Sequence, residues 1–155
     1  MKRNQPPKDE KGLTIPHDCH DILPEHRVIR RISPEWIVTS SDGKRRISTA
    51  AFDPSSKERD PYCGLSIDIE HFIVADGLDA QAYVSTPQFT GAIAIEVSKF
   101  RTRNFLVGYD PSDDNPYHGA VWADECRGSS FTRGTKKAFL KESEWFVTID
   151  GVEIV

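Results

Sequence analysis

Residues 92–97, Ala-Ile-Ala-Ile-Glu-Val, are a nearly continuous apolar run. A run of this length favours a strand that is buried on both faces of a sheet. We therefore place an interior strand here and expect the other strands of the fold around it. Glu96 is the exception in this run, because a carboxylate inside an apolar strand is costly unless it is paired or exposed at the strand end.

Shorter strands are predicted around this run. They cover residues 27–32, 36–39, 45–48, 65–70, 105–107 and 120–123. The pair Asp42-Gly43 is typical of a two-residue hairpin, because both central residues of that turn must tolerate a positive φ. A second pair, Asp150-Gly151, separates the apolar residues 146–149 from residues 152–155 and predicts a terminal hairpin.

Residues 133–145 show the clearest helical pattern, with Ala138, Phe139 and Trp145 along or beside one stripe and lysines on the other side. A shorter helix is predicted over residues 78–84. The strands do not alternate regularly with helices, which argues against a doubly wound nucleotide fold. The sequence therefore predicts an α+β fold with a mainly antiparallel sheet of short strands.

The chain of 155 residues suffices for one domain with a hydrophobic core. Residues 1–22 are polar and contain proline, and we expect them to form a mobile N-terminal tail. Residues 23–155 are then a single α+β domain. Within it, residues 53–64 form a loop by composition, and its length suggests a functional role.

The net charge of −4 does not indicate a dedicated nucleic-acid-binding protein. Basic residues are nevertheless grouped, once at Lys44-Arg45-Arg46 and again at Lys99, Arg101 and Arg103. The two groups would make a basic patch if they shared a face of the molecule. A nucleic-acid partner therefore stays open.

No apolar segment approaches the roughly 18–20 residues that span a bilayer. Residues 1–11 lack the apolar segment of a secretory signal. We therefore expect a cytoplasmic protein with no membrane partner. The cysteines, Cys19, Cys63 and Cys126, are odd in number and far apart, which agrees with reduced, structural thiols.

The motif Asn-Pro-Tyr-His-Gly at residues 115–119 places His118 where a turn meets a strand. Asp110, Asp113 and Asp114 precede the turn. An imidazole in this position can move protons near neutral pH, and close carboxylates would raise its pKa. The alternative is a structural histidine that hydrogen-bonds its own loop.

Arg31 and Arg46 lie on two predicted strands, and Ser48 and Thr49 follow the second of them. If the strands are adjacent, alternation of side chains brings an arginine from each onto one face. Guanidinium groups with hydroxyls suit phosphate or carboxylate recognition. The alternative is a charged sheet surface that faces solvent.

Glu96 is a candidate catalytic carboxylate, because functional carboxylates often occupy unusual environments. The alternative is a surface residue at the strand end, neutralised by Lys99 or Arg101. Residues 17–26 are dense in metal-ligand types, but no second ligand pair occurs at a usual spacing. The sequence therefore predicts no metal site and no cofactor.

Four segments in a fixed order resemble a group of small bacterial proteins to which no activity is assigned. The segments are residues 31–34 (Arg-Ile-x-Pro), residues 46–52 (Arg-Ile-Ser-Thr-Ala-Ala-Phe), residues 65–68 (Leu-Ser-Ile-Asp), and Asp110-Pro111 together with residues 115–118 (Asn-Pro-x-His). The resemblance covers most of residues 27–146. It implies a fold shared with that group and no particular reaction.

Arg31, Gly43, Arg46 and Phe52 also follow an order seen in the RES group of ADP-ribosyltransferase-like toxins, which degrade NAD. In that group an early arginine precedes a Gly-Arg loop and an aromatic residue, and Glu96 would stand for a later acidic residue. The Gly-Gly-Arg-Trp element of those toxins is absent here. This resemblance implies NAD as a ligand.

Two functions agree with these features. The first is a small enzyme acting on a phosphate-bearing ligand such as a nucleotide, NAD or a nucleic-acid end. Its ligand-binding residues are Arg31, Arg46, Ser48 and Thr49, and its catalytic residues are His118 and Glu96. The second is a non-catalytic module with a protein partner, such as a subunit of a bacterial defence or toxin–antitoxin assembly.

Overall fold

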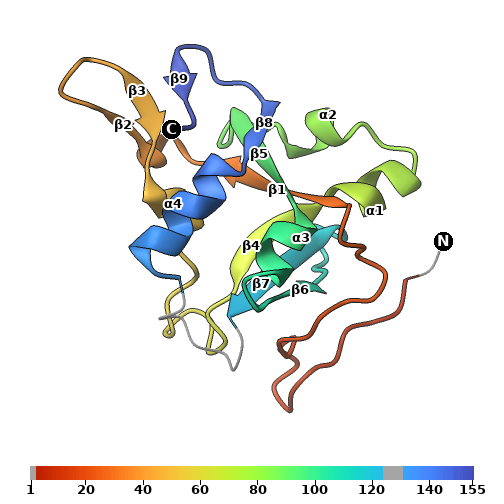
Figure 1. Ribbon diagram of the computed structural model, residues 1–155. Coiled ribbons are helices and arrows are strands. Elements are labelled where there is room, and N and C mark those ends of the chain that lie inside the picture. The colour runs from red at the N-terminus through yellow and green to blue at the C-terminus, as the bar shows by residue number, and fades with distance from the viewer. Residues whose placement is uncertain (1–2, 124–130) are drawn as a thin grey trace.

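The computed structural model describes residues 3–123 and 131–155, so Cys126 lies outside the described residues. Its largest element is a six-stranded sheet in the order β6-β7-β4-β1-β5-β8, which we call the large sheet (Figure 1). Its strands are β1 (Arg27–Ile32), β4 (Leu65–Ile69), β5 (Gly91–Glu96), β6 (Phe105–Tyr109), β7 (His118–Ala123) and β8 (Glu144–Val147). All neighbouring strands pair antiparallel. The predicted α+β class with a mainly antiparallel sheet is confirmed.

The predicted interior strand is β5, which lies between β1 and β8. Residues 91–95 are buried, and Glu96 is exposed where the strand ends. The carboxylate of Glu96 therefore stays in water and accepts a hydrogen bond from the Ser98 hydroxyl. This position explains how an acidic residue is accommodated in an otherwise apolar run.

A small sheet is formed by β2 (Ile37–Thr39), β3 (Arg45–Ile47) and β9 (Val152–Glu153). The hairpin predicted at Asp42-Gly43 joins β2 to β3. Of the two residues expected to have a positive φ, only Gly43 does, with a φ of 83°. The predicted terminal hairpin is wrong. Gly151 turns the chain with a φ of 76°, but β8 pairs with β5 and β9 pairs parallel with β3. The turn residues determine only that the chain reverses direction here. Which strands then pair depends on strands elsewhere in the fold.

The helices are short. They are α1 (Glu70–Ala75), α2 (Ala80–Val84), α3 (Val97–Arg101) and α4 (Arg133–Lys141), with 3-10 turns η1 (Pro34–Trp36) and η2 (Thr49–Phe52). The helix predicted over residues 133–145 ends four residues early, because residues 144–147 form strand β8. Pairing with β5 satisfies the backbone of this segment in the extended form and overrides its helical pattern.

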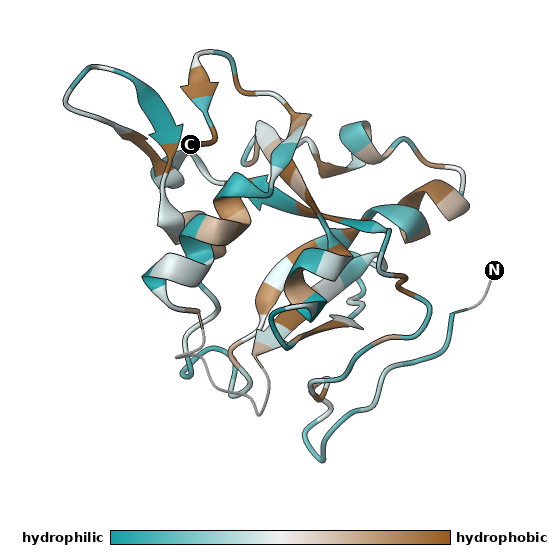
Figure 2. Ribbon diagram, viewed as in Figure 1, coloured by the Kyte–Doolittle hydropathy of each residue, from teal (hydrophilic) through white to brown (hydrophobic). Residues whose placement is uncertain are grey.

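α4 covers one face of the large sheet through a cluster of aromatic rings. The buried ring of Phe139 lies 4.6 Å from Phe100, 5.4 Å from Phe105 and 5.5 Å from Phe52, measured between ring centroids. Figure 2 shows apolar residues concentrated on the strands of the large sheet and in the C-terminal half of α4, and hydrophilic residues on β3 and on the loop that joins it to β2. None of the described helices is long and apolar enough to cross a membrane.

Residues 3–22 run along β6 and reach α1, and we call them the N-terminal segment (Figure 1). The backbone N–H of Cys19 donates to the carbonyl of Val107, and the carboxylate of Asp18 accepts from the N–H of Val107. The segment therefore covers the outer edge of the sheet, which would otherwise offer unpaired backbone groups. Arg3 is anchored by the Asp76 carboxylate at 2.9 Å. The mobility predicted for residues 1–22 stays a prediction.

Candidate functional site

The large sheet divides between β1 and β4. These strands pair only at Val28↔Ile69 and Ile29↔Asp68. Beyond that point β1 continues to pair with β5 as far as Ile32, and β4 continues to pair with β7 back to Leu65. A cleft of about 670 Å³ opens along this division, a volume typical of small-molecule sites.

The cleft is lined by both halves of the sheet and by the loops around them. The lining residues are Arg30, Arg31, Ser33, Glu35, Trp36, Asp53, Pro54, Ser55, Ser56, Arg59, Ser66, Ile67, Asp68, Gln88, Phe89, Asn115 and His118. Ser66 is exposed although it lies between buried Leu65 and Ile67 on an interior strand. Ser66 is exposed because β1 no longer pairs with β4 at this position.

Arg30 bridges the division. Its Nε donates to the carbonyl of Ala51, and Nη1 donates to the carbonyl of Ser66, at 2.7 and 2.8 Å. Its guanidinium carbon lies 4.6 Å from the ring centroid of Trp36. Burial lowers the pKa of Arg30 to about 10, so the group is still charged at neutral pH. Neither hydrogen-bonding partner carries a charge, although the nearby carboxylates of Asp53 and Asp68 act on the cation and partly oppose the lowering of its pKa.

Arg31 has a different environment, because its donors are engaged by Asp68. Nε and Nη2 of Arg31 donate to the two carboxylate oxygens at 2.8 and 3.1 Å. The amide of Asn115 donates to the same carboxylate at 2.8 Å. Asp68 is only 4% exposed and is the buried charged residue of the described core. Arg31 therefore neutralises a buried carboxylate, and Asn115 ties that carboxylate to the turn before His118.

His118 opens β7 opposite Asp68, which places both side chains on one sheet face. Nδ1 of His118 lies 2.8 Å from the carbonyl oxygen of Asp110 and 3.4 Å from its carboxylate. Burial alone would lower the His118 pKa, but the contacts with Asp110 outweigh it and the pKa is raised.

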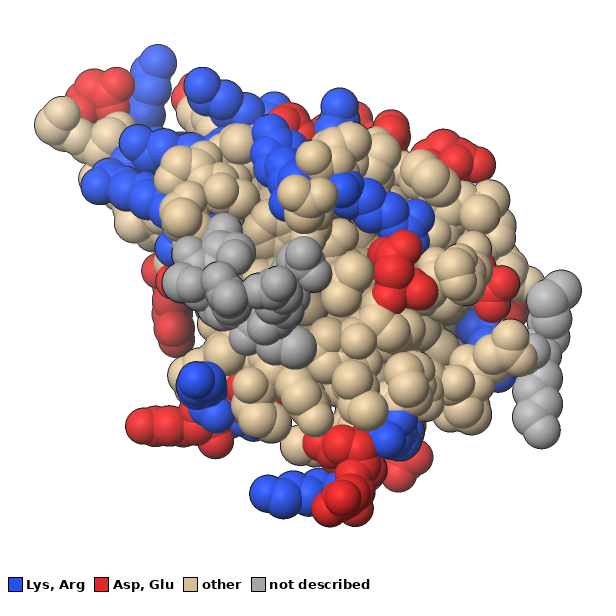
Figure 3. Space-filling model, turned by 60° about the horizontal axis from the view of Figure 1, so that its bottom comes forward, with Lys and Arg blue, Asp and Glu red and all other residues tan. Residues whose placement is uncertain are grey.

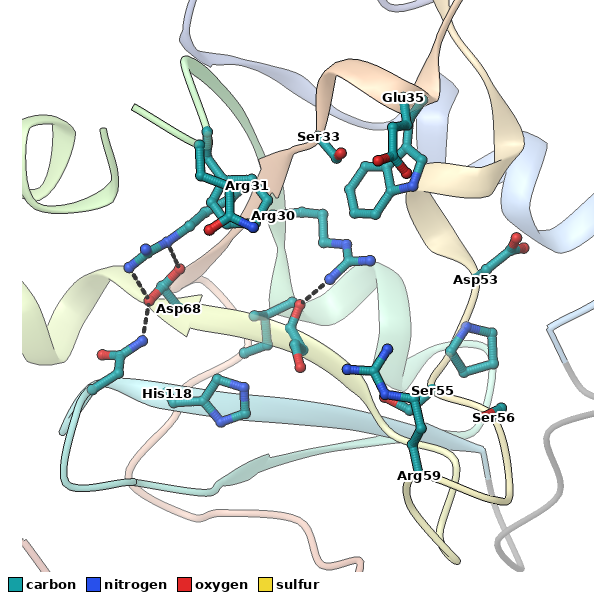
Figure 4. A pocket seen from close by; sticks show the side chains of 17 residues that line it. Arg30, Arg31, Ser33, Glu35, Asp53, Ser55, Ser56, Arg59, Asp68 and His118 are labelled. Carbon is teal, nitrogen blue, oxygen red and sulfur yellow. Dashed lines mark hydrogen bonds and ion pairs between the residues drawn. The ribbon is translucent and has the colours of Figure 1, made fainter. Parts of the chain in front are cut away.

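The imidazole of His118 lines the cleft, as Figure 4 shows. Within the described chain, Nε2 has no hydrogen-bond partner, and no buried side-chain nitrogen or oxygen lacks one. Nε2 therefore reaches solvent. A histidine held through Nδ1 with Nε2 accessible has the arrangement of a general acid or base.

Arg59 supplies a second cation from the loop at residues 53–64. Its guanidinium has no acidic partner among the residues that the structure describes, and it points across the cleft towards the region of Arg30 and His118 (Figure 4). Ser55 and Ser56 come from the same loop and line the same wall. The sequence flagged this loop by its length but did not identify Arg59.

Carboxylates are also present in the cleft wall. Asp53 is paired with Lys136 of α4 at 2.6 Å, and Asp68 is paired with Arg31. Glu35 is exposed at the far end from His118 (Figure 4). Asp53 and Asp68 are thus neutralised by basic partners, whereas Arg59 has no acidic partner among the described residues.

Of the six predicted site residues, two line the cleft, namely His118 and Arg31. Arg46 is exposed on β3, in the small sheet, where it pairs with Val38 and Glu153. The strands of Arg31 and Arg46 thus lie in different sheets, and the expected shared face does not exist. Ser48 and Thr49 lie at the start of η2, and Glu96 ends β5. None of these four is among the residues that line the cleft.

The ligand-rich stretch around residue 17 is used structurally. Nδ1 of His17 bonds the carbonyl of Ile15, and Nε2 accepts from the N–H of Tyr109. Asp18 is paired with Arg101 at 3.0 Å. In the described parts of the chain, no three His, Cys, Asp or Glu side chains are placed to hold a metal ion.

Basic side chains gather on one side of the molecule (Figure 3). The exposed ones on the β2–β3 hairpin are Lys44, Arg45 and Arg46, and those on α4 are Arg133, Lys137 and Lys141. Arg101 and Arg103 of the second predicted group are paired with Asp18 and Glu142. The chain thus carries a basic face despite its acidic total.

Comparison with known proteins adds nothing to this geometry. No family model matches the chain, and searches of curated proteins and of solved structures found no match. Evidence for the function of this protein therefore comes from the cleft itself.

Proposed function

We propose that this protein is an enzyme that binds a phosphate-bearing ligand in the cleft and uses His118 to transfer a proton. The observation that carries the proposal is the fixed imidazole of His118. Asp110 holds Nδ1, and Nε2 is left accessible in the cleft that Arg59 also lines. An imidazole that only supported its loop would not need a solvent-accessible Nε2 in a cleft lined by Arg59, which has no acidic partner among the described residues.

Arg59 and Arg30 are the proposed phosphate-binding groups. Guanidinium donors match the oxygens of a phosphate, and such charge-assisted hydrogen bonds are stronger than neutral ones. Arg30 is fixed by two carbonyl oxygens and Arg59 belongs to a loop. Arg30 would therefore supply a preformed contact, and Arg59 would close on the ligand. The hydroxyls of Ser55 and Ser56 are further donors on that wall.

The raised pKa of His118 favours the role of general acid. A raised pKa keeps more of the imidazole protonated near neutral pH. As a water molecule attacks phosphorus and the bond to the leaving oxygen breaks, Nε2–H can donate its proton to that oxygen. Asp110 stabilises the imidazolium before that transfer. Arg31 is assigned a positioning role, because its donors hold Asp68, and Asp68 holds Asn115 beside the His118 turn.

Calorimetric titration with pyrophosphate and AMP, on the wild type and on Arg59→Ala, tests binding. We expect either ligand to bind the wild type and to bind Arg59→Ala more weakly. Arg46→Ala is the matched control, because it removes an exposed arginine outside the cleft. Absence of binding by the wild type, or equal losses in the two variants, would overturn the phosphate site.

Hydrolysis of phenyl phosphate and diphenyl phosphate, whose phenolate leaving groups need a proton, tests the catalytic role as probes of monoester and diester cleavage. We expect one of them to be turned over by the wild type and not by His118→Gln. If His118→Gln still binds the ligand but neither protein turns over a substrate, the protein is a binding module and His118 is not a catalytic residue.

The basic face supports a second candidate function, that of a non-catalytic interaction module. Lys44, Arg45 and Arg46 project from the hairpin, outside the cleft lining. Such a cluster suits an acidic protein partner or a nucleic acid. Salt-dependent binding of a polyanion that is lost in Arg45→Ala/Arg46→Ala, in a protein that binds neither pyrophosphate nor AMP, would favour this function.

A further inference from the structure

The end of the cleft away from His118 differs in chemistry from the proposed phosphate site. β1 ends at Ile32, which pairs with Gly91 at the start of β5. Ser33 and Trp36 follow β1, and Gln88 and Phe89 precede β5, so this register brings the two pairs to the same end of the sheet. Four residues distant in sequence therefore form one wall, and all four line the cleft.

Two of these residues are aromatic and half-buried. Trp36 packs partly against the core and Phe89 is held in a turn by its own backbone, whose N–H donates to the carbonyl of Thr86. Arg30 lies against Trp36, with its guanidinium carbon 4.6 Å from the ring centroid. Aromatic rings and arginine planes are the surfaces on which proteins stack unpaired bases.

Polar groups surround these flat surfaces. The side chains of Ser33, Glu35 and Gln88 make no hydrogen bond within the part of the chain that the structure describes, and all three line the cleft. In Figure 4, Ser33 and Glu35 lie on the opposite side of Arg30 from His118. A hydroxyl, a carboxylate and an amide together offer donors and acceptors for the edge of a heterocyclic ring.

We propose that this end of the cleft, with Trp36, Phe89 and Gln88, is a nucleobase subsite, so that the ligand is a nucleotide. The inference rests on the proposed phosphate site and extends it. The phosphate occupies the end with Arg59 and His118, the base occupies the aromatic end, and Arg30 lies between them. The cleft of about 670 Å³ lies within the range of sites that accept ligands of this size.

The test compares AMP and CMP with ribose 5-phosphate, which carries the same phosphate and sugar without a base. Calorimetric titration of the wild type should give a nucleotide affinity roughly 5- to 150-fold above that of ribose 5-phosphate, the effect of stacking one base. Equal affinity for all three ligands would overturn the base subsite and leave the phosphate site standing. No binding of any of the three would mean that the phosphate site itself fails.

Variants locate the base. Phe89→Ala should remove much of the difference in affinity between the nucleotides and ribose 5-phosphate. It should leave the affinity for ribose 5-phosphate unchanged. Trp36→Phe keeps a ring beside Arg30 and serves as a second variant that is less disturbing to the core. Quenching of Trp36 fluorescence by AMP, absent with ribose 5-phosphate and absent in Trp36→Phe, would support the placement. If Phe89→Ala keeps the full difference in affinity between the nucleotides and ribose 5-phosphate, and AMP does not quench Trp36, the base lies elsewhere and the proposal is overturned.

Discussion

The Nδ1 atom of His118 lies 2.8 Å from the carbonyl oxygen of Asp110 and 3.4 Å from the carboxylate of the same residue. One residue thus fixes both the orientation and the charge of the imidazole. The hydrogen bond to the carbonyl keeps a proton on Nδ1, and the carboxylate favours a second proton on Nε2. This relationship makes His118 titrate differently from a free histidine.

The first prediction concerns the pH dependence of stability. The His118 pKa in the folded protein is raised above 6.5. The contribution of His118 to the free energy of unfolding is therefore complete below pH 6.5, and it is lost as the pH rises through the folded-state pKa. Although burial raises the Asp110 pKa, the contacts with His118, Thr14 and Lys8 outweigh it. The Asp110 pKa is therefore lowered below 3.8, and its contribution is lost as the pH falls through that folded value.

The pair is therefore most stabilising between about pH 4 and 6.5. Urea unfolding should show His118→Gln to be less stable than the wild type at pH 5.5, with a smaller difference at pH 8.5. His20→Gln is the control, because His20 is exposed. A difference that grows with rising pH would contradict the assignment of a raised pKa.

The second prediction separates catalysis from binding. A positioned general acid typically contributes about 100- to 10,000-fold, so His118→Gln should reduce kcat by that factor with a small change in KM. Arg59→Ala should raise the Kd for a phosphate-bearing ligand by about 10- to 100-fold, as expected for a hydrogen bond to a charged group. Steady-state kinetics and calorimetry check the two effects. A similar loss of kcat in both variants with unchanged Kd would contradict this division of roles.

The third prediction concerns the buried carboxylate of Asp68. Arg31→Met leaves that carboxylate without its cation, and should lower the free energy of unfolding by about 3–5 kcal/mol. Arg103→Met breaks the more exposed pair with Glu142 and should cost about 0–1 kcal/mol. Urea denaturation measures both values. Adding Asp68→Asn to Arg31→Met should recover part of the loss, and a further loss would contradict this account.

The fourth prediction concerns the glycine after His118. A Cβ atom at Gly119 would lie 2.7 Å from the carbonyl oxygen of Gly108 on the neighbouring strand β6. Gly119→Ala should therefore destabilise the protein by about 1–3 kcal/mol, the usual effect of overpacking. Gly134 in α4 has open space around its Cα, so Gly134→Ala should stabilise by about 0.5–1 kcal/mol. Thermal unfolding of the two variants should shift in opposite directions, and equal shifts would refute the steric explanation.

Local features of the sequence predicted much of the fold. The apolar run at residues 92–97 gave β5, and Asp42-Gly43 gave the β2–β3 hairpin with its positive φ. These features depend on burial and on turn sterics, which adjacent residues determine. The end of α4 and the partner of β9 were predicted wrongly, because each depends on strands far away in the chain.

The candidate site was only partly predictable for the same reason. His118 was identified from its own motif, and the structure places it in the cleft. Arg46 was grouped with Arg31 on the assumption that their strands are neighbours, whereas β3 belongs to the small sheet. Arg30 and Arg59 could not be distinguished from other arginines, because their role depends on the groups that surround them.

The sequence by itself determined the α+β class, the positions of most strands and the acidic surroundings of His118. Hydrophobic periodicity, turn residues and local charge are properties of short segments, and they can be recognised without the fold. Only the tertiary structure decided that the sheet divides between β1 and β4, that Asp68 engages Arg31, and that Arg59 and His118 line one cleft. Those relationships join residues separated by tens of positions, and they follow from strand order and register, which no local pattern encodes.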